Sequence, residues 1–250
     1  MPPETQKPKE TAAAANVKSR PKDLRSYGTK INDYSEYVEV IVGTDDLLKR
    51  LIVHKQLLID RSLYFKKALS GAWVEAQEQK VRLPEDDPAT FQVYVNLLYT
   101  DQISLSPVDS SKDANLAAQE EFEDLIDLYV LAEKLQDVNT KNKAIAALLG
   151  STFEVRSDGL EYLPGIDAIE RAYKNTTSES LLRKLIVDLW TEFGASGGVV
   201  RDEEYPSEFL HDMVIGLLEK RDRNDDVIDG RDEKVISRDD ASPYLEAGDA

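Results

Sequence analysis

The sequence predicts an α+β fold, in which short strands near the amino terminus precede a series of amphipathic helices. The strands are indicated by YVEVIVG at 37–43, where valines alternate with other residues, and by the apolar run at 51–53. A period of two is typical of a strand with one buried face. From residue 88 onward, apolar residues instead recur every three or four positions, which favours helices. A chain of 250 residues is long enough to bury a sizeable core.

The two apolar segments are expected to pair as a β-hairpin. Gly43 and the polar residues after it form the turn signal between the run at 37–43 and the run at 51–53. The segment QKVRL at 79–83 predicts a third short strand. This strand is expected to end before Pro84, since proline cannot donate to a strand ladder.

Between the second and third strands, residues 55–69 show helical spacing that is interrupted near Ser62. Two short helices joined by a serine cap explain the interruption better than one long helix. After the third strand, Asp87 as a cap and Pro88 as the first helical residue predict another helix. Further helices are expected at 121–135, after a polar loop at 101–115, and from Asp137 to about Leu149.

The residues after 150 predict a helical extension. Glycine and proline at 150–164 favour a connection, and Thr176 and Glu179 have the spacing of a capping box ahead of the next helix. A last amphipathic helix is expected at 207–220. We therefore place the helical extension at 160–220.

Both ends of the chain are polar and are expected to be disordered, as a basic tail at 1–30 and an acidic tail at 221–250. Residues 1–30 carry a local charge of +4, so the other 220 residues carry −21 of the total of −17. Such a body repels the phosphate backbone, and we therefore expect no nucleic acid as a partner.

Several classes of site are excluded by what the sequence lacks. Without cysteine there are no disulfides, no thiol catalysis and no thiolate-ligated zinc. No phosphate loop, dinucleotide fingerprint or nucleophile elbow occurs, so we expect no cofactor and no enzyme. The acidic run at 222–233 resembles a calcium loop, but Val227 replaces its required glycine, so no metal is expected. No apolar segment approaches the length of a membrane span, and we expect an intracellular protein without a membrane partner.

Four motifs follow one another along the chain in the order in which they occur in a known family, and the resemblance to that family rests on them. They are His54-Lys55, Arg61-Ser62-x-Tyr64-Phe65, Leu98-Tyr99-Thr100 and Leu131-Ala132-Glu133-Lys134. Together with LPEDDPATFQVYVNLLYT, they make residues 31–149 similar to the BTB/POZ domain, in the style of the single-domain fungal BTB proteins. The resemblance implies a small mixed sheet flanked by a helical cluster, with the helical extension after it. It also implies a role in protein–protein interaction without catalysis.

The resemblance assigns a structural motif to His54, Ser62, Tyr64, Phe65 and Tyr99. It implies that nearby backbone groups satisfy the imidazole of His54. A lone histidine at a strand–helix junction also lacks the second group that general-base or metal chemistry needs. We therefore predict no catalytic residue in this chain.

The resemblance further places Glu36 and Lys55 at the positions of an acidic and basic pair that lines a charged pocket at the dimer interface of family members. Most relatives have aspartate at the acidic position, and glutamate is one methylene longer. The alternative is a solvated surface pair that contributes less than about 1 kcal/mol. We favour the surface pair.

The segment Trp73-Val74-Glu75 matches the apolar-x-Glu pattern with which cullin-binding relatives contact their scaffold. An aromatic side chain can fill a pocket of the partner while a neighbouring charge fixes orientation. The alternative is that Trp73 folds back on its own domain and Glu75 only caps a turn. Both interpretations remain open from the sequence.

The sequence thus predicts an interaction module, most concretely a substrate adaptor for a cullin-based ubiquitin ligase. The alternatives are a scaffold in nuclear or transcriptional complexes and, least favoured, an enzyme of unrecognised type. Dimeric relatives usually place an apolar amino-terminal helix against the partner subunit, whereas residues 1–33 offer only scattered apolar residues. We therefore expect a monomer or a weak homodimer, in the cytoplasm or the nucleus.

Overall fold

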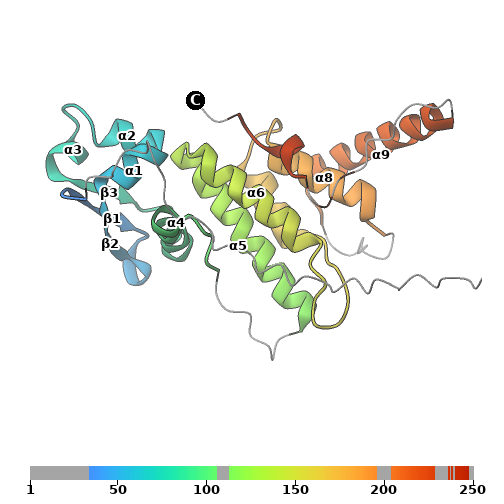
Figure 1. Cartoon of the computed structure of the whole chain (residues 1–250), viewed down its shortest axis with the longest axis horizontal. Coiled ribbons are helices and arrows are strands. Elements are labelled where there is room, and N and C mark those ends of the chain that lie inside the picture. Colours follow the sequence, from blue (N-terminus) through green and yellow to red (C-terminus); the bar gives the residue numbers. More distant parts are fainter. Residues whose placement is uncertain are drawn as a thin grey trace, which may run out of the picture. The chain divides into compact units, whose positions relative to one another are not determined.

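The computed structural model describes residues 34–105, 113–195, 204–228, 236, 238 and 240–247 (Figure 1). The basic tail expected at 1–30 lies outside these residues. None of the described helices combines the length and the apolar character that a membrane crossing requires. In chain order the elements are β1 Tyr37–Val42, η1 Asp45–Leu47, β2 Lys49–His54, α1 Lys55–Arg61, α2 Leu63–Ala68, α3 Val74–Glu78, β3 Lys80–Leu83, α4 Pro88–Thr100, α5 Ala114–Leu135, α6 Val138–Thr152, α7 Ile166–Asn175, α8 Leu181–Phe193, α9 Ser207–Ile228 and η3 Ser242–Tyr244.

The three strands form one mixed sheet in the order β2-β1-β3. β1 pairs antiparallel with β2, which sets Val38 opposite Val53, and parallel with β3, which sets Val40 opposite Val81. The valines of β1 are fully buried on one face, as the alternation predicted. The predicted hairpin, the third strand and the small mixed sheet are therefore confirmed.

The chain breaks between α1 and α2 at Ser62, as predicted. Ser62 has extended backbone angles, and its hydroxyl oxygen accepts a hydrogen bond from the Phe65 amide at 3.1 Å. This bond satisfies one of the free amides at the start of α2. The same hydroxyl donates to the Leu135 carbonyl at 2.6 Å, at the end of α5. One buried serine therefore caps a short helix and ties it to a long one.

Two apolar cores meet at α5. The first lies between the buried face of the sheet and α1, α2 and α4, and it includes Leu128 and Leu135 of α5. The second joins α5 to α6, α7, α8 and Phe209 of α9, and it includes Phe122 and Tyr129 of α5. Figure 1 shows α5 and α6 side by side. One helix, α5, therefore contributes side chains to both cores, and α7 packs directly on it.

The start of α5 differs from the sequence prediction. The helix begins at Ala114 rather than at 121. The carboxylate of Asp113 accepts hydrogen bonds from the amides of Asn115 and Leu116 at 3.0 and 3.3 Å. An aspartate cap of this kind stabilises a helix start by about 1 kcal/mol. The alanines of the first two turns also favour a helix, and Ala118 is buried in the second core.

The capping box predicted at Thr176 and Glu179 is wrong. Ser180 caps α8, because its hydroxyl oxygen accepts from the Leu182 amide at 3.3 Å. The Thr176 hydroxyl instead donates to the Ala172 carbonyl at 2.6 Å, in the last turn of α7. Threonine at this position therefore ends one helix rather than starting the next.

The expectation that 221–250 is disordered is wrong for part of that segment. α9 runs to Ile228, and residues 240–247 pack against α6 and α8. Tyr244 in η3 is 4% exposed and belongs to the second core. Composition averages over a segment, so it does not reveal one aromatic side chain that fits an existing surface.

A pH-dependence is expected from α5, because burial raises the pKa of Asp127 although Arg171 lies 2.7 Å away. A carboxyl group whose pKa is raised on folding binds more protons folded than unfolded, so its contribution to stability falls as pH rises through that range. We expect Asp127→Asn to gain stability relative to the wild type between about pH 3 and pH 7. Urea unfolding at several pH values measures this trend.

Asp158→Asn is the control of opposite sign. The hydroxyl of Tyr162 donates to Asp158 and holds the pKa of that carboxyl below its usual value. The stability that this carboxylate contributes is lost as pH falls, so this variant is expected to lose stability relative to the wild type as pH rises. The same trend in both variants would contradict the assignment.

Candidate protein-interaction surfaces

His54 ends β2 and contacts Tyr99 near the end of α4. The amide of His54 donates to the Tyr99 hydroxyl at 3.2 Å, and Nδ1 of the ring lies 2.6 Å from the same oxygen. The ring of Tyr34 packs edge-on at 4.8 Å. The partner of this ring nitrogen is thus a side-chain hydroxyl, where the resemblance implied backbone. The contact joins the sheet to α4, which supports a structural role for His54.

The other residues of the predicted motif lie within the first core. Phe65 is fully buried and packs edge-on against Phe91 at 6.3 Å. Tyr64 is half-buried against Phe65, and burial raises the pKa of its hydroxyl. Together with Ser62, these residues position α2 against α5.

A buried polar network at the start of α6 was not recognised from the sequence. Asp137 is 0% exposed, and its carboxylate caps α6 by accepting from the Thr140 amide at 2.9 Å. The Tyr94 hydroxyl donates to the same carboxylate at 3.2 Å, and Nε of Arg61 lies 3.6 Å away. Burial and the adjacent carboxylate raise the pKa of Tyr94 well above its usual value. The Asp-x-x-Thr spacing was the available signal, but it identified only a helix start.

The predicted pair of Glu36 and Lys55 is formed, with Nζ of Lys55 2.8 Å from a Glu36 carboxylate oxygen. The pair borders a cavity of about 680 Å³ on the solvent face of the sheet. On the same face Glu39 contacts Lys80 at 3.0 Å, and that hydrogen bond holds the pKa of Glu39 below its usual value. The other lining residues are Ser35, Tyr37, Ile52, Glu78 and Gln79. The cavity thus combines charges of both signs with the exposed apolar side chains of Tyr37 and Ile52.

The segment Trp73-Val74-Glu75 forms the start of α3, between α2 and β3. Trp73 is 66% exposed and Val74 is also exposed. The carbonyl of Trp73 accepts from the amide of Ala76, while its ring extends into solvent. The alternative in which Trp73 folds back on its own domain is therefore wrong. Glu75 lies in the first turn of α3, where a carboxylate is favoured by the helix dipole.

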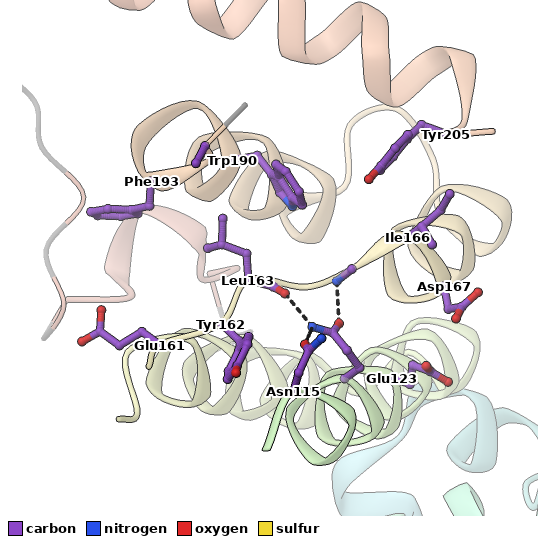
Figure 2. A pocket seen from close by; sticks show the side chains of 13 residues that line it. Asn115, Glu123, Glu161, Tyr162, Leu163, Ile166, Asp167, Trp190, Phe193 and Tyr205 are labelled. Atoms are coloured by element: carbon purple, nitrogen blue, oxygen red, sulfur yellow. Dashed lines mark hydrogen bonds between the residues drawn. The ribbon is translucent and has the colours of Figure 1, made fainter. Parts of the chain in front are cut away.

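A second cavity, of about 450 Å³, was not predicted from the sequence. Figure 2 shows the side chains that line it. Gln119 of α5 fixes the segment 163–165 along one side of the cavity. Its side-chain oxygen accepts a hydrogen bond from the Gly165 amide at 2.7 Å, and its side-chain nitrogen donates to the Leu163 carbonyl at 3.1 Å. Trp190 closes another side by donating to the Pro164 carbonyl at 3.0 Å. The side chains of Gln119 and Trp190 therefore use their polar groups in hydrogen bonds within the chain, and these bonds hold the lining of the cavity in place.

Two carboxylates that line this cavity are paired with arginines, Glu123 with Arg171 and Glu161 with Arg238. Burial raises the pKa of Glu123, but Arg171 lies 2.9 Å from it and neutralises its charge. Among the residues that the structure describes, no cluster of three histidine or acidic side chains has the arrangement of a metal site.

Comparison with protein-family models matches residues 29–143 to the BTB/POZ domain. The match covers the sheet, α1 to α5 and the first part of α6. A search of curated proteins finds no match to the chain.

Proposed function

Since residues 29–143 of this chain are a BTB/POZ domain, a protein–protein interaction module, we propose that the chain is a substrate adaptor that links another protein to the cullin scaffold of a ubiquitin ligase. BTB/POZ domains are interaction domains rather than enzymes, and we propose no catalytic activity and no cofactor. The adaptor role places the chain inside the cell, in the cytoplasm or the nucleus.

The observation that carries the proposal is the exposure of Trp73 and Val74 beside Glu75. Exposed contiguous apolar side chains on a folded domain indicate a surface that a partner covers. Tryptophan is enriched among the residues that dominate binding energy, because its large rigid ring fills a pocket with little entropy loss. The carboxylate of Glu75, in the first turn of α3, supplies the charge that orients the partner.

Binding of purified cullin to the immobilised full chain tests the proposal. We expect the double variant Trp73→Ala/Glu75→Ala to weaken binding by at least about thirtyfold, which corresponds to the 2 kcal/mol typical of an interface hot spot. Val155→Ala is the matched control, since it removes an exposed apolar side chain outside α3 and is expected to bind normally. A wild-type chain that retains no cullin contradicts the adaptor role.

A scaffold in nuclear or transcriptional complexes is the second candidate, and the cavity beside Glu36 and Lys55 favours it. Mixed charge around exposed Tyr37 and Ile52 suits the polar rim and apolar centre of a protein interface. The pair itself is solvated on the glutamate side, so we propose at most a weak homodimer through this face. A partner lost on Lys55→Glu but kept on Trp73→Ala would identify the scaffold role.

A further inference from the structure

The carboxy-terminal residues 240–247 are held by side chains of α6 and α8, and these contacts resemble recognition of a short peptide. Four residues form the receiving surface, which we call the α6–α8 surface: Lys141, Asn142, Lys184 and Asp188. Figure 1 shows η3 in red beside α8.

The first contact is an aromatic anchor. The ring of Tyr244 is 4% exposed, and its hydroxyl donates to Asp188 at 3.0 Å. Nζ of Lys184 lies 4.6 Å from the centre of the ring, within the range of a cation–π contact. The site therefore recognises both the face and the hydroxyl of a tyrosine.

The second contact is with the backbone of Glu246, two residues after Tyr244. The side-chain amide of Asn142 donates to the Glu246 carbonyl at 2.9 Å and accepts from the Glu246 amide at 2.8 Å. This reciprocal pair is available to any extended segment that places a residue at that point. The carboxylate of Glu246 adds an ion pair with the buried Lys141, which selects an acidic side chain there.

The receiving surface is organised without the segment. Lys141 also pairs with Glu133 of α5 and lies over the ring of Tyr129 at 5.4 Å, so its position and charge are supported when Glu246 is absent. Asp188 is paired with Lys184 at 3.4 Å along α8. A surface whose groups are already held in place loses little entropy when it binds a peptide.

The segment, in contrast, is attached by few side chains. Tyr244 is the one buried side chain in the described part of 236–247, while Leu245 is exposed and Glu246 is half-buried. Local opening of such a segment requires the loss of the Tyr244 contacts, the two hydrogen bonds with Asn142 and the Glu246–Lys141 ion pair. A second peptide of the same chemistry can therefore compete for the surface.

We propose that the α6–α8 surface is a peptide-binding site for partner proteins that carry a Tyr-x-Glu segment, and that this chain's own residues 240–247 occupy it until such a segment displaces them. The site goes beyond the proposed function and does not require cullin binding. It supplies the adaptor with a place to bind a target, at a distance in sequence from Trp73.

The test uses the full chain with Tyr244→Ala as the host and a fluorescent peptide DASPYLEA, the sequence of 240–247, as the probe. We expect the peptide to bind this variant at least about tenfold more tightly than the wild type, in which the tethered segment competes. Adding Asn142→Ala to the host is expected to weaken binding about tenfold. Leu245→Ala in the wild type is the control, because it alters an exposed neighbour and leaves the segment in place.

Two results would overturn the proposal. One is a folded Tyr244→Ala host that does not bind the peptide, or that binds it equally well after Asn142→Ala. The other is a wild-type dimer in light scattering that Tyr244→Ala abolishes, since the occupant would then be the segment of a second copy.

Hydrogen exchange on the wild type keeps the test independent of whether the variant folds. We expect the amides of 241–247 to exchange faster than those of α8, as local opening requires. Equal protection in both segments would show that 240–247 opens only when the whole protein unfolds, and that result would also overturn the proposal.

Discussion

Asp137→Ala is expected to lower the free energy of unfolding by about 4 kcal/mol, the range observed when one partner of a buried charged pair is removed. Three losses combine at this position. α6 loses its cap, the buried hydroxyl of Tyr94 loses its acceptor, and the guanidinium of Arg61 loses the nearest carboxylate to its buried Nε. Urea unfolding followed by circular dichroism measures the change.

Asp113→Ala is the matched control for Asp137→Ala. Asp113 also caps a helix through its carboxylate, but its side chain is exposed, whereas that of Asp137 is buried. Loss of such a cap costs about 1 kcal/mol. Equal destabilisation by the two variants would mean that the network around Asp137 adds nothing to its role as a cap.

Arg183→Met is expected to lower the free energy of unfolding by about 3 kcal/mol. Arg183 is buried in α8, and its guanidinium donates to the carbonyls of Tyr173 and Thr176 at the end of α7. It also donates to Glu208 of α9 at 2.5 Å. One side chain therefore satisfies the free carbonyls at the end of α7 and connects α7 to α9. Methionine has a similar volume but no hydrogen-bond donor. Thermal and urea unfolding measure the loss.

Arg171→Met is the control for the arginine substitution. Arg171 pairs with Glu123 and Asp127 of α5, but its side chain is 44% exposed, against 6% for that of Arg183. Exposed ion pairs contribute about 0–1 kcal/mol, so this variant should unfold close to the wild type. If Arg171→Met were as damaging as Arg183→Met, burial of the guanidinium would not be the cause of the larger effect.

The Trp73 segment and the α6–α8 surface belong to parts of the chain that pack around different cores. Trp73 follows α2, which packs on the first core, whereas Asn142 and Asp188 belong to helices of the second. α5 contributes side chains to both cores. A closely packed helix deforms little. Two partners bound to these two surfaces would therefore keep a fixed position relative to each other.

Several elements of this fold are determined by the local sequence alone, without tertiary contacts. The alternating valines of β1, the serine cap at Ser62 and the Asp87-Pro88 start of α4 each depend on neighbours within four residues. The resemblance then identified the family and the place of the Glu36–Lys55 pair. The strand alternation, the serine cap and the start of α4 follow from the sequence because their causes lie next to them along the chain.

The tertiary structure alone decided the features whose partners are far apart in sequence. The sequence could not choose between a buried and an exposed Trp73, since both orientations satisfy the same local pattern. It marked Asp137 as a helix start, while the contacts with Arg61 and Tyr94 depend on how three helices pack. Tyr244 stands in a polar, acidic segment and is buried only because α6 and α8 together present a surface that fits it. The burial of a side chain and its contacts with distant residues depend on how the helices pack, so only the tertiary structure determines them.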